Sequence, residues 1–263
     1  MTAGAERIGI ARNWGRGMDN PITSERYLIV NADDFGRTAA INRGVVRGHA
    51  EGIVTSASLM VRREGAEDAS AYASRHRDLS LGLHVDLGEW ELRGGQWEPT
   101  SKNLPLNDLP EVEAEVDDQL ARFRELTGED PTHLDSHQHV HRREPVRTVL
   151  RRRARELGVP LRHYARGVRH CGAFYGQDEE GRSRSEDVGL NRLMEILEAL
   201  EPGVTELACH PGEDGEDPPG YARERPLELL TLCDPRARAA IRRLGILLCS
   251  FREAPLTIPG ASG

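Results

Sequence analysis

A nine-residue stretch from His133 to His141, with the sequence His-Leu-Asp-Ser-His-Gln-His-Val-His, holds four of the ten histidines in the chain. In an extended strand, side chains two residues apart share one face. We therefore expect one face of a strand to carry His133, Asp135, His137, His139 and His141. Buried imidazoles and a carboxylate need a polar partner, and a divalent metal ion supplies one. The alternative is a solvated strand end, but the density of histidine far exceeds what composition predicts.

Two adjacent carboxylates, Asp33 and Asp34, follow the apolar run 27–30. They repel each other and resist burial, and a cation relieves both problems. Neighbouring strand residues point to opposite faces, so both can reach one site only where the strand breaks, and we place that break at Phe35-Gly36. The alternative is an acidic N-cap for the helix expected from Thr38.

Two further histidines end predicted strands. His84 lies in an otherwise apolar strand, where a lone histidine is more often a core residue, but its position beside other polar strand ends favours a ligand. His210 follows Leu207-Ala208-Cys209 and could cap its strand or act as a general acid. Sites in parallel α/β folds form at the carboxyl ends of strands. A carboxylate with two imidazoles leaves coordination positions open for catalysis, with a second carboxylate as base and another histidine as acid.

Predicted strands and helices alternate along the chain, which indicates parallel strands joined by crossover helices. We predict an α/β, single-domain fold: an incomplete or distorted (β/α) barrel of about seven parallel strands, with a doubly wound sheet as the alternative. The expected strands are 27–30, 53–61, 79–87, 133–141, 161–164, 205–210 and 246–251. The expected helices are 38–51, 65–75, 111–127, 144–157, 190–200, 226–233 and 235–244.

Two long segments, 88–110 and 167–184, show no regular pattern. The first contains Trp90 and Trp97, and the second contains Tyr175. Long loops in compact domains are often lids or substrate walls, so we expect both to border the site.

Composition excludes several classes. The 263 residues carry a net charge of −8, which gives no footprint for nucleic acid. No run is long and apolar enough to span a membrane, and no nucleotide-binding glycine motif follows a strand. Four cysteines without a C-x-x-C pair indicate a reduced, cytoplasmic location. We expect residues 1–26 to be a flexible polar extension without a secretory signal, 27–255 the domain and 256–263 a tail.

Three segments resemble the signatures of the YdjC-type carbohydrate deacetylases, which include chito-oligosaccharide deacetylases and are related to polysaccharide deacetylases. They are Asn31–Gly36, Gly82–His84 and His133–His141. The resemblance runs in order from Tyr27 to Arg252. It implies a distorted (β/α) barrel.

Carried over position by position, the resemblance implies that Asp34, His84 and His137 hold the metal. Asp33 would be the catalytic base and His210 the acid that protonates the leaving amine. Arg162 would orient the base. The residues expected to support the ligands or contact the substrate are Asp135, His139, His141 and Tyr175. His137 alone among the row would reach the metal, because alternate side chains lie about 7 Å apart along a strand.

The leading hypothesis is therefore a metal-dependent hydrolase that removes the N-acetyl group from an amino sugar through a water activated by the metal. One alternative is another metal-dependent hydrolase, a phosphoesterase or cyclic amidase, which two tightly bound ions per chain would favour. A carbohydrate-binding relative without catalysis is the other. Mixed ligands favour Zn²⁺, Mn²⁺ or Co²⁺ by softness, whereas the resemblance implies Mg²⁺. It also implies a homodimer, and we expect no nucleic-acid or membrane partner.

Overall fold

The computed structural model describes residues 24–93, 96–99, 104–178, 180–214 and 221–256. The extension predicted for residues 1–26 lies outside the described residues except for 24–26. The tail predicted for 256–263 lies outside them except for its first residue.

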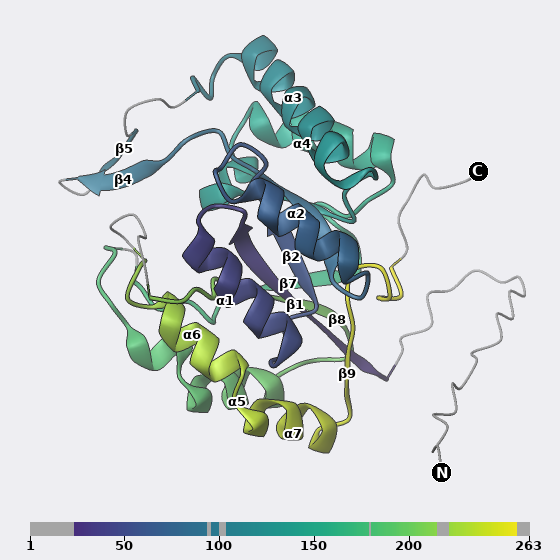
Figure 1. The fold of residues 1–263 in the computed structure, drawn as a ribbon, viewed down its shortest axis with the longest axis vertical. Coiled ribbons are helices and arrows are strands. Elements are labelled where there is room, and N and C mark those ends of the chain that lie inside the picture. Colours follow the sequence, from purple (N-terminus) through teal and green to yellow (C-terminus); the bar gives the residue numbers. More distant parts are fainter. Residues whose placement is uncertain (1–23, 94–95, 100–103, 179, 215–220, 257–263) are drawn as a thin grey trace, which may run out of the picture.

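One parallel sheet organises the described chain (Figure 1). Its strands are β1 (Arg26–Phe35), β2 (Ser56–Leu59), β3 (Ser80–Val85), β6 (Leu134–Ser136), β7 (Val168–Cys171), β8 (Gly203–Cys209) and β9 (Ile246–Leu248). Six of them run in the order β6-β3-β2-β1-β8-β7, and β9 pairs with the start of β1. All these pairs are parallel. The sheet curls into a half-barrel, which confirms the predicted incomplete (β/α) barrel of seven parallel strands in a single domain.

β1 lies at the centre of this sheet. One of its edges pairs with β8 from Arg26 to Ala32, and the other pairs first with β9 and then with β2. A strand with neighbours on both edges has its backbone hydrogen bonds satisfied along its length. This makes β1 a rigid support for the two carboxylates near its carboxyl end.

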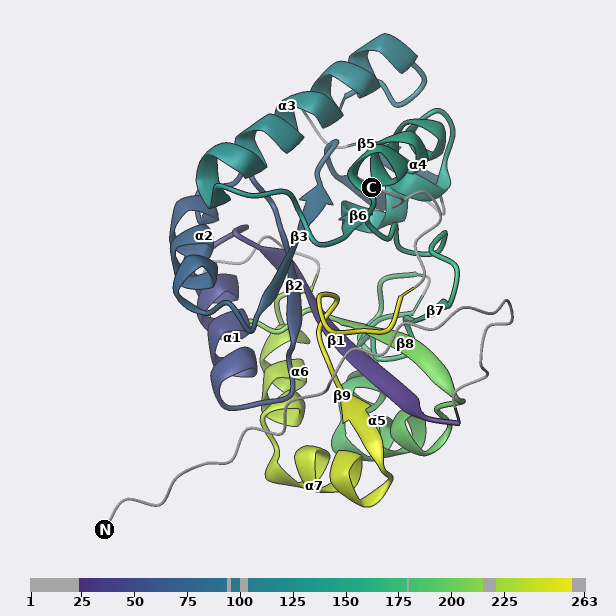
Figure 2. The same ribbon diagram turned by 90° about the vertical axis from the view of Figure 1, so that its right-hand side faces the viewer.

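The helices surround the sheet in two views related by a quarter turn (Figures 1 and 2). They are α1 (Ala39–Ala50), α2 (Ala66–Arg75), α3 (Leu109–Thr127), α4 (Val146–Leu157), α5 (Leu190–Glu198), α6 (Arg225–Leu232) and α7 (Pro235–Arg243). Contacts join them in the order α4-α3-α2-α1-α6 and, through the 3₁₀ turn η2 (Ser185–Val188), α5 and α7. Among the described residues, no helix has the length and apolar character of a membrane span.

Local sequence signals define the helix ends. The hydroxyl of Thr38 accepts a hydrogen bond from the Ile41 amide at the start of α1, and Asp108 does the same for α3. Side chains of this type satisfy amide groups that have no partner within the helix. Gly128 and Gly158 adopt left-handed conformations where α3 and α4 end. Thr38 therefore caps α1, which removes the alternative of an acidic cap at Asp33 or Asp34.

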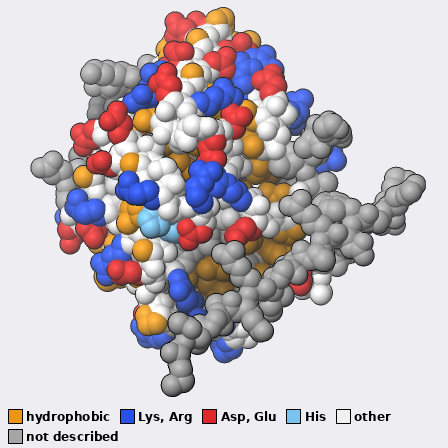
Figure 3. Space-filling model, turned by 45° about the vertical axis from the view of Figure 1, so that its right-hand side comes forward, with side chains coloured by type: hydrophobic (Ala, Val, Ile, Leu, Met, Phe, Trp, Pro, Cys, Tyr) orange, Lys and Arg blue, Asp and Glu red, His pale blue; other side chains and the backbone are white. Residues whose placement is uncertain are grey.

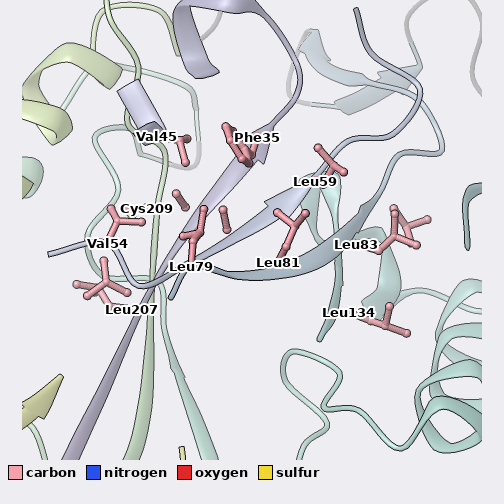
Figure 4. Packing of buried hydrophobic residues seen from close by; sticks show 14 of the residues in the cluster. Phe35, Val45, Val54, Leu59, Leu79, Leu81, Leu83, Leu134, Leu207 and Cys209 are labelled. Atoms are coloured by element: carbon pink, nitrogen blue, oxygen red, sulfur yellow. The ribbon is translucent and has the colours of Figure 1, made fainter. Parts of the chain in front are cut away.

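The core lies between the sheet and the helices, and Figure 4 shows its central part. Phe35 of β1, Leu83 of β3 and Leu207 of β8 are fully buried, and Val45 of α1 packs among them. Each such side chain stabilises the fold by about 1.5–3 kcal/mol relative to exposure. This apolar packing fixes the strand ends at which polar residues collect.

Three expectations about secondary structure are wrong. The stretch 133–141 is not one strand, because β6 ends at Ser136 and a 3₁₀ segment, η1 (His137–Arg142), follows. The segment 88–110 contains the antiparallel hairpin of β4 (Trp90–Arg93) and β5 (Gln96–Pro99) and the start of α3.

The third error concerns the next sheet strand. The predicted strand 161–164 is reduced to a single bridge between Leu134 and Leu161, while Val168–Cys171, expected to be loop, forms β7. The short apolar content of β7 explains the miss, since only Val168 and Cys171 of its four residues are apolar.

The face drawn in Figure 3 carries basic and acidic side chains interspersed with each other. Ion pairs join neighbouring helices, as between Arg153 of α4 and Asp117 of α3. Exposed pairs of this kind contribute at most about 1 kcal/mol each. They help to align neighbouring helices, but the buried core dominates stability.

Candidate active site

The carboxyl end of β1 places Asp33 and Asp34 in different surroundings. The pairing of β1 with β2 shifts register between Ala32 and Phe35, and Asp34 has a φ of 63°. A left-handed conformation at a residue other than glycine costs about 1–3 kcal/mol and persists only where the surroundings impose it. β1 therefore has an irregularity at Asp34 and ends at Phe35, where the break at Phe35-Gly36 was predicted. Both carboxylates are buried.

Asp34, His84 and His137 converge on one point. The Oδ1 atom of Asp34 lies 3.4 Å from Nε2 of His84 and 3.1 Å from Nδ1 of His137. A ligand atom of each lies within 4.8 Å of the others, and all three residues are buried. The structure therefore brings together the three residues predicted as ligands, from the ends of β1, β3 and β6.

Three observations fit this cluster to a divalent cation. The Oδ1 atom of Asp34 is buried and has no hydrogen-bond partner. The other ring nitrogen of His84, Nδ1, lies 2.7 Å from Oδ1 of Asp135. A carboxylate in this position orients a metal-binding imidazole and turns its free nitrogen toward the ion.

The charge balance is the third observation. Five buried carboxylates of the site face three buried guanidinium groups: Asp33, Asp34, Asp135, Glu206 and Glu228 against Arg37, Arg162 and Arg225. Although burial opposes protonation, Asp135 and Asp34 raise the pKa of His84 to about 10. A proton on His84 thus partly offsets the excess negative charge, and a divalent cation beside neutral imidazoles would offset it more fully.

Arg225 fixes the second oxygen of Asp34. Its guanidinium donates to Oδ2 at 2.5 Å. Burial alone would raise the pKa of Asp34, but Arg225 and His137 outweigh burial and hold that pKa well below its usual value. Asp34 is therefore an anion with one oxygen fixed and the other directed at the two imidazoles.

Arg162 holds Asp33 in a different way. Its NH1 and NH2 groups donate to Oδ2 and Oδ1 of Asp33 at 2.6 and 2.7 Å. The same guanidinium contacts Asp135 at 2.8 Å and Glu206 at 2.7 Å. Although burial raises it, Arg162 lowers the pKa of Asp33 to about 2. Asp33 is therefore ionised and fixed in orientation.

His210 faces Asp33 from the end of β8. Its Nε2 atom lies 3.8 Å from Oδ2 of Asp33, and its Nδ1 atom lies 3.8 Å from Oε1 of Glu228. The backbone amide of His210 donates to the other oxygen of Glu228 at 2.5 Å. The turn is held tightly against α1, because a Cβ on Gly44 would lie 2.4 Å from Cα of Gly212. His210 thus presents one imidazole nitrogen to the site and the other to a buried carboxylate.

The sequence matches the YdjC-like protein family over residues 27–243. The chain belongs to the YdjC-like family. A chitooligosaccharide deacetylase of Serratia marcescens is 32% identical, with 87% of this chain and 99% of that protein covered. A carbohydrate deacetylase of Geobacillus stearothermophilus is 31% identical, with 87% and 98% covered.

Solved structures agree with this membership. One from Enterococcus faecalis, described as a cellobiose-phosphate cleavage protein, has a TM-score of 0.69 and 27% identity and covers 87% of this chain and 98% of that chain. A deacetylase solved with its substrate has a TM-score of 0.50 at 14% identity, over 90% of this chain and 92% of that chain, and supports the fold alone. Proteins with low sequence identity to this chain therefore share its half-barrel fold.

Two of the residues predicted to support the ligands or contact the substrate lie beside further histidines. His139 and His141 gather with His163 and His170. The left-handed conformations of Gln138 and His139, with φ of 49° and 52°, turn the chain after His137. Burial lowers the pKa of His139 to about 2 and that of His141 to about 3, so both are neutral.

Sequence reasoning missed several charged residues of the site. They are Arg37, Glu89, Glu206, Arg225 and Glu228. A usable signal existed for Glu206, a lone carboxylate inside the apolar strand 204–209, because a buried charge requires a partner. Glu228 and Arg225 lie on α6, where they resemble ordinary polar positions of an amphipathic helix, and only tertiary structure reveals that both are buried.

Residues of the 88–110 and 167–184 segments lie along two sides of the candidate site. Both polar groups of the Gln138 side chain bond the backbone of Trp90, each at 2.9 Å, and so join η1 to the β4–β5 hairpin. Tyr175 lies 5.4 Å from His210 between ring centroids and stacks on Tyr221 at 4.5 Å. The side chain of Trp97 lies outside the described part. The aromatic pair therefore borders the His210 side of the site.

Proposed function

We propose that this chain is a metal-dependent carbohydrate N-deacetylase that hydrolyses the acetamide of an amino sugar, with chito-oligosaccharides as the substrate class. The observation that carries this proposal is the separation of two adjacent carboxylates. Asp34 lies with two imidazoles as a ligand set, and Asp33 is held apart by Arg162 and faces His210. The names of the relatives, carbohydrate and chitooligosaccharide deacetylases, support the substrate class.

The ligand atoms are Oδ1 of Asp34, Nε2 of His84 and Nδ1 of His137. When bound there, a divalent cation supplies Lewis-acid chemistry, which makes the acetyl carbonyl more electrophilic and water more acidic. On the other side of the His137 ring, Nε2 lies 3.6 Å from Oε1 of Glu89 and 3.3 Å from NH1 of Arg37. One carboxylate and two imidazoles suit Zn²⁺, Mn²⁺ or Co²⁺ better than Mg²⁺ by ligand type.

Asp33 accepts the proton of the attacking water. Its low pKa makes it a weak base at rest, but it ensures that the carboxylate is ionised at neutral pH. The bidentate contact with Arg162 fixes the direction of its oxygens, so that orientation rather than basicity is the main contribution. Arg162 acts here as a positioning residue.

His210 donates a proton to the departing nitrogen. Its Nε2 atom lies 3.8 Å from Oδ2 of Asp33, so the base and the acid can act from two sides on the same acetyl carbonyl carbon. Oε1 of Glu228 lies 3.8 Å from Nδ1, on the side of the ring away from Asp33. The Tyr175 side chain, 39% exposed, provides a ring surface against which a sugar can pack.

Acetate release from N-acetylated chito-oligosaccharides tests the proposal. We expect turnover by the purified chain, at least a hundredfold loss in Asp33→Asn, and complete loss after removal of divalent metal by a chelator, with recovery on metal addition. His76→Asn, a histidine on the far end of α2, is the matched control. Full activity in Asp33→Asn or without metal would refute the mechanism, and binding without turnover under any metal would support a catalytically inactive relative.

One alternative has a specific observation behind it. The Enterococcus faecalis structure is described as a cellobiose-phosphate cleavage protein. A phosphorylated disaccharide is therefore included in the same assay with phosphate release as the readout. Phosphate without acetate would replace the deacetylase proposal with a phosphoesterase.

A further inference from the structure

Three histidines outside the Asp34 cluster converge on a second point. They are His139 and His141 of η1 and His163, which follows Arg162. A ring nitrogen of each lies within 4.8 Å of the others. We propose that His139, His141 and His163 form a second, all-imidazole site for a late first-row transition metal such as Zn²⁺.

The spacing of the nitrogen atoms suits coordination. Nε2 of His141 lies 2.9 Å from Nδ1 of His163. Around a tetrahedral Zn²⁺ with bonds of about 2.0–2.1 Å, nitrogen ligands lie about 3.3 Å apart. The His141–His163 pair has to open by only a few tenths of an ångström, and His163 can supply this movement because its side chain is exposed.

The remaining polar atoms of His141 prepare it as a ligand. The Oγ atom of Ser136 lies 2.7 Å from Nδ1 of His141 and accepts a hydrogen bond from the His141 amide at 2.9 Å. A proton on Nδ1 directed at Ser136 leaves the lone pair on Nε2, the atom that faces His163. Coordination through Nε2 requires this tautomer, and the Ser136 hydroxyl is placed to accept the proton of Nδ1.

His139 adds an atom that the protein leaves unsatisfied. Its Nδ1 is buried and has no hydrogen-bond partner. Such groups are rare in folded proteins and call for an explanation, which a bound ion provides. His170 is the nearest further imidazole, with its ring centroid 4.3 Å from that of His163 and 5.6 Å from that of His139. It is the candidate fourth ligand.

The two sites differ in chemistry and share no residue. Asp34 belongs to the first, whereas the second contains no carboxylate. Three neutral imidazoles favour Zn²⁺, Cu²⁺ or Ni²⁺ and disfavour Mg²⁺ and Ca²⁺, which require oxygen ligands. In the part of the chain that the structure describes, no residue belongs to both sets, so ions in these two sites would not constitute the paired-metal centre of a phosphoesterase.

Metal stoichiometry of the full chain tests this inference. The protein is stripped with a chelator, equilibrated with Zn²⁺ or with Mg²⁺, desalted and analysed for bound metal. We expect two Zn²⁺ per chain in the wild type and one in His163→Asn. We expect one in Asp34→Asn and none in the double variant. Mg²⁺ is expected at no more than one ion per chain, and not in Asp34→Asn.

Asparagine is chosen because His163 has a φ of 67°, a conformation that asparagine tolerates. The matched control is His76→Asn, which removes one of another pair of neighbouring imidazoles, His49 and His76 with centroids 6.1 Å apart, and should keep two Zn²⁺. We expect the affinity of the second ion to fall more than about 100-fold in His163→Asn, beyond the effect of losing an outer hydrogen-bond partner.

Either of two results would overturn the inference: one Zn²⁺ per chain in the wild type, or a second ion that His163→Asn retains. Measuring His163→Asn in the wild-type background keeps the test valid even if Asp34→Asn does not fold. The inference does not depend on deacetylation, because metal content is measured without substrate.

Discussion

The two halves of the histidine stretch use the same side chain for different purposes. In the strand half, His133 is buried, and both of its nitrogens are paired, Nδ1 with Thr132 at 2.9 Å and Nε2 with Ser58 at 3.0 Å. Its ring stacks on Phe251 with centroids 3.9 Å apart. In the turn half, His137 faces a carboxylate oxygen that has no hydrogen-bond partner.

This difference shows that the satisfaction of the nitrogens, and not the density of histidine, separates structural from functional positions. A buried imidazole with two partners behaves as a core residue. An imidazole whose nitrogen faces an unsatisfied oxygen has coordination capacity left. The backbone creates the division, because the chain leaves the strand after Ser136 and turns at Gln138 and His139.

Among substitutions that distinguish the strand half from the turn half of the histidine stretch, His137→Ala should have the largest effect on activity. Loss of a ligand removes the stabilisation of the transition state by the metal, which is worth several kcal/mol. We therefore expect the rate of acetate release to fall by roughly a thousandfold or more, with bound metal lost from the Asp34 site. His137 is buried among polar groups and not in the apolar core, so we expect the Tm measured without metal to change little. Activity assays, metal analysis and thermal unfolding are compared. Retention of metal and activity would assign His137 to the structural half.

His133→Ala should show the opposite pattern. It removes a buried ring and two hydrogen bonds, so we expect a loss of about 2–4 kcal/mol in the free energy of unfolding and a Tm lower by roughly 5–10 °C. Metal binding at the Asp34 site should persist, with activity per folded molecule within about tenfold of the wild type, because Asp135 keeps its contact with His84. Loss of the metal with an unchanged Tm would contradict the division.

Gly82 provides a smaller test of the same packing. A Cβ at this position would lie 2.4 Å from Nε2 of His133, so Gly82→Ala pushes the ring away and should cost about 1–3 kcal/mol. In a protein that already carries His133→Ala the clash is absent, so we expect Gly82→Ala to change the free energy of unfolding by a value near zero. A double-mutant cycle by chemical denaturation measures this coupling. Additive effects would show that the His133 ring does not occupy the space above Gly82.

Sequence could supply the frame of this division. The alternation of strands and helices predicted the parallel half-barrel. Asp33, His84, His137 and His210 do lie at the ends of strands, as predicted from their positions after apolar runs. His84 and His137 do converge on Asp34. These features follow from local patterns and from the general geometry of parallel sheets.

The rest depends on tertiary contacts. Period-two spacing made the five polar residues of the stretch equivalent. No local signal marks the turn at Gln138, because its left-handed backbone conformation is one that would be expected at glycine or asparagine. Arg225 and Glu228 come from a helix far along the chain, and only packing brings them to Asp34 and His210. The gathering of His163 and His170 with His139 required the position of β7, which sequence did not predict.

The pH dependence of stability gives the smallest effect and isolates His133. Burial lowers its pKa to about 4, against an ordinary value near 6.5 in the unfolded chain. The native state therefore binds fewer protons, so the stability contributed by neutral His133 is complete above about pH 6.5 and is lost as the pH falls toward 4. We expect the Tm difference between wild type and His133→Asn to narrow by a few degrees from pH 7 to pH 4.5. His139, His141 and His163, with lowered pKa values, titrate in both proteins and cancel in the difference. A gap that stays constant with pH would mean that His133 titrates alike in the folded and unfolded chain, and that burial does not hold it neutral.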